Sequence, residues 1–299
     1  MRTPDFLVVG TARAGTTALH SYLRQHPDIF LPKLNEPCFF VFEGGSNKFN
    51  KGKFAFAIRH FNEYQQLFSR AEANQKIGEM STPYLYLFEK TISTVKKYFN
   101  DYAEIKIIIL LRNPVDRAYS QYKWRVRDGR EPLHFEEAIK EEKARMNANY
   151  SFDYYYVDRG FYYEQVKAYQ ANFKNVHFVY FDDFNSEPFP VLKDICRFLG
   201  VNENVNFKKI KRQNESAAPR SKSLSKLATS ESALKFKLWF ALPDVIRSNV
   251  RRLFSKMNTK KTGVKKMNPL TRQQLIETYR DDIVALQQLT GRDLSEWLK

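Results

Sequence analysis

Two uninterrupted apolar runs, at 6–9 and 107–111, dominate the hydrophobic pattern of the chain. Neither run alternates with polar positions, and continuous Val, Ile and Leu are typical of parallel strands that are buried on both faces. A third run, at 176–181, mixes aliphatic and aromatic residues and predicts a further strand of the sheet. Apolar residues also recur at helical spacing over 16–26 and 188–199, which predicts amphipathic helices.

The same spacing predicts helices at 59–71, 133–147 and 270–289, and one that ends near 173. A tyrosine-rich stretch at 149–157 follows the second of these helices. Its rings would serve equally well to stack on sugar rings or to cover the core, and both interpretations stay open from sequence alone.

The loop between the first strand and the first helix carries the clearest chemical signal. Gly10 and Gly15 let the main chain approach a ligand, and a helix N-terminus offers unpaired N–H groups and a positive dipole to an anion. The glycine spacing matches the nucleotide-phosphate loop G-x-x-x-x-G-K-[ST], but Thr16 stands at the position of its lysine. An ordinary ATP or GTP site is therefore disfavoured. The cation is instead Arg13, with hydroxyls from Thr16 and Thr17, and the alternative is a glycine-containing turn of some other α/β protein.

The strand at 107–111 is followed by a cation. An NTPase would place an aspartate here to hold Mg²⁺, whereas this chain has Arg112, followed by a helix N-cap, Asn113, and a first-turn proline. Ser120 lies two turns into that helix, so Arg112 folded back over the helix start could grip one phosphate together with it. The alternative is a salt bridge between Arg112 and Asp116.

Glu36 is a carboxylate set between Asn35 and Pro37, with an apolar stretch at 39–42 directly behind it. An apolar environment raises the basicity of a carboxylate, as a general base requires. The alternative is that Glu36 pairs with a lysine or arginine in this basic protein.

Together these motifs resemble the sulfotransferases that use 3′-phosphoadenosine-5′-phosphosulfate (PAPS), whose 5′-phosphosulfate loop reads roughly Lys-x-Gly-Thr-Thr where this chain reads Arg-Ala-Gly-Thr-Thr. The resemblance implies that the loop binds the 5′-phosphosulfate and that Arg112 and Ser120 hold the 3′-phosphate. In the glycan-modifying branch a glutamate in a matching context takes the proton of the acceptor hydroxyl, which implies that role for Glu36. The residues that the resemblance assigns to catalysis or nucleotide binding are Glu36, Arg13, Ala14, Gly15, Thr16, Thr17, Arg112, Ser120 and, in a later basic loop, Arg220 and Lys222.

The chain departs from this pattern at two positions. Arg13 replaces the lysine that the family places against the leaving phosphate, and Met80 stands where some relatives carry a working lysine. An inactive relative is therefore a further alternative. Glu79, beside Met80, is a second carboxylate, which we expect to be structural, buried at a strand end with a basic or backbone partner. The segments 159–162 and 291–298 also resemble family sequences, the latter those of bacterial sulfotransferases.

Composition narrows the partners without selecting one. The 49 Lys and Arg against 33 Asp and Glu leave a net charge of +16, which favours a nucleotide, nucleic acid, an anionic glycan or an anionic membrane. The chain has 2 cysteines, Cys38 and Cys196, and no Cys/His cluster with metal-ligand spacing, which argues against a disulfide framework or structural zinc.

A basic amphipathic segment at 233–266 fits either a helical hairpin packed on the domain or docking on an anionic membrane. If it docks, a lipid-linked acceptor becomes attractive. The sequence shows neither a signal segment nor an apolar run long enough to cross a membrane, so we expect a cytoplasmic protein, at the membrane surface if docking holds.

We therefore expect one sulfotransferase domain over 1–299, with a helical insertion at 233–266 and a C-terminal helix and tail at 270–299. Its fold class would be α/β, three-layer α/β/α around a central parallel sheet, as in the P-loop-NTPase-like sulfotransferases. The resemblance implies PAPS as co-substrate, 3′,5′-adenosine bisphosphate as product, no metal, no nucleic acid, and an acceptor hydroxyl on a carbohydrate or glycolipid. Two alternatives are a P-loop kinase or NTPase, which predicts Mg²⁺-dependent ATP turnover, and a nucleic-acid-binding protein, whose affinity would fall steeply with salt.

Overall fold

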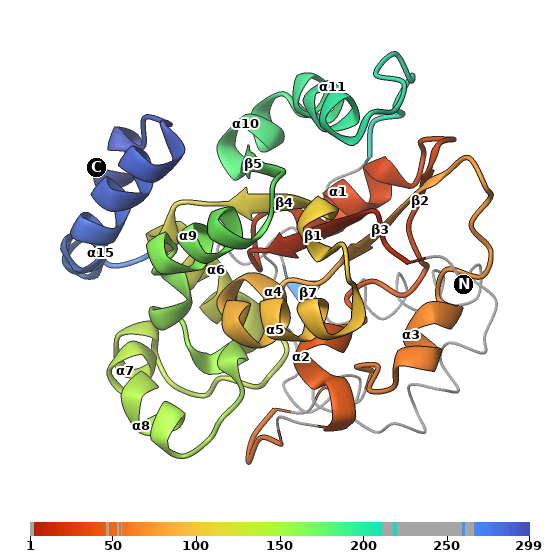
Figure 1. Cartoon of the computed structure of the whole chain (residues 1–299). Coiled ribbons are helices and arrows are strands. Elements are labelled where there is room, and N and C mark those ends of the chain that lie inside the picture. The colour runs from red at the N-terminus through yellow and green to blue at the C-terminus, as the bar shows by residue number, and fades with distance from the viewer. Residues whose placement is uncertain are drawn as a thin grey trace.

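The computed structural model (Figure 1) describes residues 3–45, 48–52, 54, 56–210, 218–219, 259–260 and 266–299. Within these residues, five strands form one parallel sheet in the order β2–β3–β1–β4–β5. Their bounds are β1 (Phe6–Gly10), β2 (Ile29–Phe30), β3 (Lys76–Met80), β4 (Lys106–Leu111) and β5 (Val176–Tyr180). A separate antiparallel pair joins β6 (Ala218–Pro219) to β7 (Thr259–Lys260). The α/β class with a central parallel sheet is confirmed.

The two apolar runs form the middle of the sheet. All five residues of β1 are buried, as are the last five of β4, because helices cover both faces of these strands. Alternate residues enter different clusters, with Leu7 and Ile107 on one face and Phe6 and Ile108 on the other. The neighbouring β3 approaches so closely that a Cβ on Gly78 would lie 2.1 Å from Phe6 Cζ.

Helices pack on both faces of the sheet (Figure 1), which gives the three-layer arrangement. The face with Phe6 is covered by α1 (Thr16–Leu23), α10 (Phe181–Ser186) and α11 (Pro188–Leu199). The face with Leu7 is covered by α2 (Phe39–Phe42), α4 (Pro83–Tyr86), α5 (Phe88–Tyr98), α6 (Pro114–Arg127) and α9 (Tyr163–Asn172), with α15 (Pro269–Thr290) packed on α6 and α9. The remaining helices are α3 (Phe61–Gln66), α7 (Phe135–Lys140), α8 (Glu142–Asn147) and the short turns η1 (Glu43–Gly45), η2 (Tyr102–Glu104), η3 (Phe152–Tyr154), η4 (Asp158–Gly160) and η5 (Ser295–Leu298).

The predicted helices are present, but several are shorter than expected. The first ends at Leu23 rather than at 26, and the helix predicted over 59–71 covers only α3. The helix predicted over 133–147 is broken into α7 and α8 at Glu141. Just after this boundary, the buried carboxylate of Glu142 accepts hydrogen bonds from the backbone N–H groups of Val157 at 2.8 Å and Asp158 at 2.7 Å.

The tyrosine-rich stretch covers the core. Tyr154, Tyr155 and Tyr156 are buried in the cluster on the Leu7 face, and Tyr150 packs against it half-buried. Apart from β7 and residue 266, the basic amphipathic segment at 233–266 lies outside the described residues. None of the helices in the described ranges is long and apolar enough to span a membrane.

Candidate functional site

The loop after β1 leaves the first turn of α1 open to a ligand. The residue before the helix, Gly15, has φ 88° and offers no side chain to cap the free N–H groups. Only glycine suits this left-handed position beside Phe184, whose ring would lie 3.3 Å from an added Cβ. Thr16 is buried and Thr17 half-buried at the start of the helix, as expected for residues that lie against a bound group.

The structure brings together the two cationic motifs that lie about a hundred residues apart in the sequence. Arg112 Nη1 donates a hydrogen bond to the carbonyl oxygen of Arg13 at 2.7 Å, and Arg13 Nε donates to Ser120 Oγ at 3.2 Å. The reason is topological, since β1 and β4 are neighbouring parallel strands whose carboxyl ends meet at one edge of the sheet. The anticipated alternative, an Arg112–Asp116 salt bridge, is replaced by a 2.7 Å ion pair between Asp116 and Arg272.

This edge of the sheet concentrates positive charge. The pKa of Arg13 is lowered to about 10, mainly by burial and also by the nearby charges of Arg127 and Arg112. Burial likewise lowers the pKa of Lys123, with Arg112 and Arg13 as the next causes. An anion bound here would relieve this mutual repulsion.

Two of these cations were missed by the sequence analysis. Lys123 and Arg127 follow Ser120 by three and seven residues on α6, so they lie on the same side of that helix. The helical spacing from Ser120 was a signal that could have found them. Arg127 Nε donates to Asp128 Oδ1 at 3.2 Å, whereas Lys123 lies over the ring of Tyr119 at 5.0 Å.

Glu36 sits in a turn that the end of β3 holds in place. Its backbone is left-handed, with φ 61°, and its N–H donates to the carbonyl oxygen of Met80 at 3.1 Å. Its carboxylate Oε2 accepts a hydrogen bond from Thr82 Oγ1 at 2.9 Å. Among the described residues, the hydrogen-bond partner of this carboxylate is therefore a hydroxyl and not the lysine or arginine of the alternative interpretation.

The environment of Glu36 gives it the basicity expected of a general base. Burial raises the pKa of its carboxyl to about 7, although the hydrogen bond from Thr82 acts in the opposite direction. Within this net value, Asp153 also acts to raise the pKa, and the positive charges of Arg159 and Arg13 act to lower it. Because Arg13 acts on Glu36, the base candidate and the anion-binding loop belong to one site.

A group of buried arginines lies near Glu36, and the sequence analysis noted only Arg159 among them, as part of the 159–162 segment. Arg125 and Arg159 both pair with Asp153, at 3.2 Å and 3.5 Å, and Arg117 donates to the carbonyl oxygen of Tyr156. The 159–162 motif contributes Arg159 to this group. The hydroxyl of its last residue, Tyr162, donates a hydrogen bond to the carbonyl oxygen of Arg112 at 3.1 Å. The motif thereby helps to fix the strand end that carries Arg112.

The structure shows where the side chains of Glu79 and Met80 lie. Glu79 is buried at a strand end as expected, but its partner is a hydroxyl rather than a basic or backbone group, since Ser81 Oγ donates to its Oε1 at 2.6 Å. Met80 points to the other face of the sheet and belongs to the cluster under α1 and α11.

Arg220 and Lys222 lie outside the described residues. Among the residues that are described, no group of 3 or more His, Cys, Asp or Glu could hold a metal ion.

Comparison with known proteins agrees with this geometry. A model of the sulfotransferase domain family matches residues 3–280. The chain is 33% identical over 145 residues to the membrane-associated sulfotransferase kil1 of Dictyostelium discoideum, which covers 46% of this chain and 28% of that protein. It is 25% identical over 218 residues to the human bifunctional heparan sulfate N-deacetylase/N-sulfotransferase 3, covering 69% of this chain and 23% of the relative.

The chain thus spans about a quarter of the length of these curated relatives. Its structure matches that of a sulfotransferase from Alicyclobacillus acidocaldarius over 100% of both chains, with a TM-score of 0.76 and 29% identity. With the family model matched over most of its length and this fold, the chain belongs to the sulfotransferase family.

Proposed function

We propose that this sulfotransferase moves a sulfuryl group from PAPS to a hydroxyl of a carbohydrate acceptor. The proposal rests on two hydrogen bonds, one from Arg112 to Arg13 and one from Arg13 to Ser120. It also rests on the position of Glu36, whose pKa is lowered by the charge of Arg13. The two hydrogen bonds connect the helix start, where an anion can bind, to a second cationic position. PAPS is an adenosine nucleotide with anionic groups at both its 5′ and 3′ ends, so it fits two neighbouring anion sites.

The residues that would hold the donor come from two strand ends. The 5′-phosphosulfate would lie on the loop Arg13, Ala14, Gly15, Thr16 and Thr17, where free N–H groups and hydroxyls can donate to it. The 3′-phosphate would contact Arg112 and Ser120. Lys123 and Arg127 add positive potential on the same helix, and the resemblance assigns a covering role to Arg220 and Lys222.

Transfer would proceed by in-line attack of the acceptor oxygen on sulfur. A new O–S bond forms, the bond from sulfur to the 5′-phosphate oxygen breaks, and the acceptor proton moves to the carboxylate of Glu36. Arg13 and the loop donors would stabilise the charge that grows on the departing phosphate. A base with a pKa of about 7 is ionised in a large fraction of molecules at neutral pH and still strong enough to take this proton.

The acceptor class is inferred from the relatives. The human relative is named for N-sulfation of heparan sulfate, and the chain aligns with less than a third of that protein, so a glycan or glycolipid acceptor is a proposal for this chain. The alternatives of other classes find less support. A kinase or NTPase would need the loop lysine and a metal-binding aspartate, and the chain has Thr16 and Arg112 at those positions.

The test is transfer of radiolabelled sulfate from PAPS to a panel of glycans that includes unsulfated heparosan, heparan sulfate and chondroitin. We expect label in at least one glycan and its loss in Glu36→Gln. Arg13→Lys is assayed in parallel, because activity in both proteins shows a tuned site, whereas activity gained only with lysine shows a site that the arginine has inactivated. Label in none of the glycans, combined with Mg²⁺-dependent ATP turnover, would contradict the proposal.

A further inference from the structure

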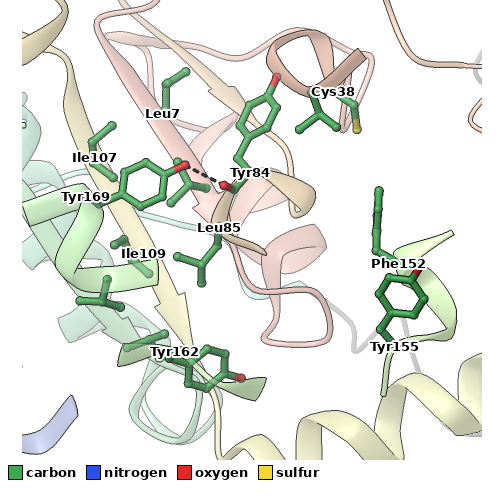
Figure 2. Packing of buried hydrophobic residues seen from close by; sticks show 14 of the residues in the cluster. Leu7, Cys38, Tyr84, Leu85, Ile107, Ile109, Phe152, Tyr155, Tyr162 and Tyr169 are labelled. Carbon is green, nitrogen blue, oxygen red and sulfur yellow. Dashed lines mark hydrogen bonds between the residues drawn. The ribbon is translucent and has the colours of Figure 1, made fainter. Parts of the chain in front are cut away.

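Glu79 is a fully buried carboxyl for which the mechanism above has no use. It lies in the interior beneath α3 and α4, where its side chain is 0% exposed. The hydroxyls of Tyr64 and Tyr84 face it, and Ser81 donates to its Oε1. Figure 2 shows Tyr84 and Cys38 in this packed cluster, where the Tyr84 carbonyl oxygen also accepts a hydrogen bond from Tyr169.

A short hydrogen-bonded chain connects Glu79 to the turn that carries Glu36. Ser81 Oγ gives its hydrogen to Glu79 Oε1 at 2.6 Å, and its free lone pair accepts the backbone N–H of Cys38 at 2.9 Å. Together with the contacts of Met80 and Thr82 to Glu36, the end of β3 therefore holds residues 36–38 at three points.

This turn needs such support. Both Glu36 and Cys38 have left-handed backbones, with φ of 61° and 55°. Residues with a Cβ disfavour this conformation, so it persists only where surrounding contacts impose it. The Cys38 thiol adds one local contact, to the carbonyl oxygen of Glu36 at 3.2 Å.

We propose that Glu79 is a positioning residue for sulfotransfer, which fixes Ser81 and through it the Cys38 N–H and the Glu36 turn. The inference rests on the proposed role of Glu36 as base. The role is one of position and not of chemistry, because the side chain of Glu79 is fully buried.

The groups around Glu79 explain why its neutral form is the stable one. Facing it are the hydroxyls of Tyr64, Tyr84 and Ser81, and the charges or dipoles that act on it or respond to it belong to Glu36, Cys38 and Tyr169. These groups are hydroxyls, a thiol and a second carboxyl, so they provide no compensating cation. The pKa of Glu79 is raised to about 8, mainly by burial and also by the charge of Glu36. Of the two carboxyls, Glu36 is the less buried and the one whose pKa is raised less.

The first test needs no acceptor. In a Cys196→Ala background Cys38 is the remaining cysteine, and its labelling by a thiol reagent reports opening of the turn. We expect Ser81→Ala and Glu79→Ala to speed labelling about five- to tenfold, as the loss of a buried hydrogen bond would. Glu79→Gln, which resembles the neutral acid in shape and charge, should stay within about twofold of the parent, as should Ser93→Ala on the exposed side of α5. Equal labelling in all variants would overturn the proposal.

The second test reports the charge of Glu79. Its pKa is raised from the usual 4.5 to about 8 in the folded protein, so the unfolded chain loses this proton first as pH rises. The stability of the wild-type protein therefore falls as pH rises from about 5 to about 8. The melting temperature of Glu79→Gln, whose side chain cannot ionise, should rise relative to that of wild type over the same range. A difference that stays flat across this range would show an ordinary ionised glutamate and contradict the proposal.

Transfer assays then separate this inference from the proposed function. We expect Ser81→Ala to lower kcat about tenfold, with the affinity for 3′,5′-adenosine bisphosphate and the KM for PAPS unchanged, and Glu79→Gln to restore most of the activity that Glu79→Ala loses. If wild type transfers no sulfate while Cys38 labelling follows the expected pattern, the proposed function fails and the hydrogen-bonded support of the turn stands. If wild type is active and Ser81→Ala has wild-type kcat, the positioning role fails.

Discussion

Two features of the structure act on the Glu36 carboxyl. Thr82 donates a hydrogen bond to it, and burial disfavours its charged form. These two effects oppose each other, and burial is the larger, so the net pKa is near 7 rather than near 4. The carboxyl is thus basic enough to accept a proton while the neighbouring donor keeps its orientation fixed.

Replacing Glu36 with glutamine should remove the base without changing the shape of the site. We expect Glu36→Gln to lower kcat by about a hundredfold to ten-thousandfold, the usual contribution of general base catalysis. The affinity for 3′,5′-adenosine bisphosphate should be unchanged, since Glu36 lies on the acceptor side. Steady-state kinetics and nucleotide titration measure the two quantities, with the exposed Glu89→Gln as the matched control. A nucleotide affinity that falls with kcat would indicate a folding defect or a different role.

The pH dependence of transfer should follow the same carboxyl. Because Glu36 must be ionised to accept a proton, kcat should rise with pH and level off above about pH 7. Thr82 stabilises the ionised form, so Thr82→Val should raise the pKa of Glu36 and move the acidic limb to higher pH. The kcat–pH profile of both proteins measures this. An acidic limb that moves to lower pH, or does not move, is incompatible with the proposed donor.

At the scale of elements, the sequence pattern predicted the strands and helices that carry most of the site. The apolar runs became β1 and β4, and Asn113 caps α6 as its position before a proline indicated, with its side chain accepting from Val115 N–H at 3.0 Å. The helix predicted over 133–147 is present but divided at Glu141, a division that the local pattern does not show.

The helix cap of α6 gives a stability prediction that also bears on the site. Asn113→Ala removes the side chain that caps the first turn, so the free energy of unfolding should fall by about 1 kcal/mol. Because Arg112 directly precedes this cap, nucleotide affinity should weaken as well. Urea unfolding and nucleotide titration measure the two effects, and Asn268→Ala at the cap of α15 is the matched control that should affect stability alone. Loss of nucleotide affinity of equal size in the control would remove the link between cap and site.

At the scale of the molecule, the sheet order explains why the site lies where it does. Each of three neighbouring strands is followed, at its carboxyl end, by one part of the proposed site. The residues that hold Glu36 follow β3, the Arg13 loop follows β1, and Arg112 follows β4. The strong positive net charge favours anionic partners as a whole, and this edge of the sheet is where we propose that the nucleotide binds.

Whether a contact of the site could be predicted from the sequence depends on how far apart its residues lie along the chain. The loop, Arg112 with Ser120 and Glu36 were identified because each motif is local or resembles a family sequence. The surroundings of Glu79 and the buried partners of Asp153 were not, because they join residues from separate elements. The contact of Arg13 with Ser120 follows only once β1 and β4 are known to be neighbours.

The central claim is that Arg13, Arg112 and Ser120 form one site for an adenosine nucleotide that is anionic at both ends. Its most direct test is calorimetric titration with 3′,5′-adenosine bisphosphate and, separately, with ATP and Mg²⁺. We expect the bisphosphate to bind much more tightly than ATP, and Arg112→Gln to weaken it about ten- to hundredfold, as the loss of a charged hydrogen-bond partner would. Arg280→Gln, on the exposed side of α15, should leave binding unchanged. Equal binding of both nucleotides, or bisphosphate binding that is indifferent to Arg112, would contradict the account.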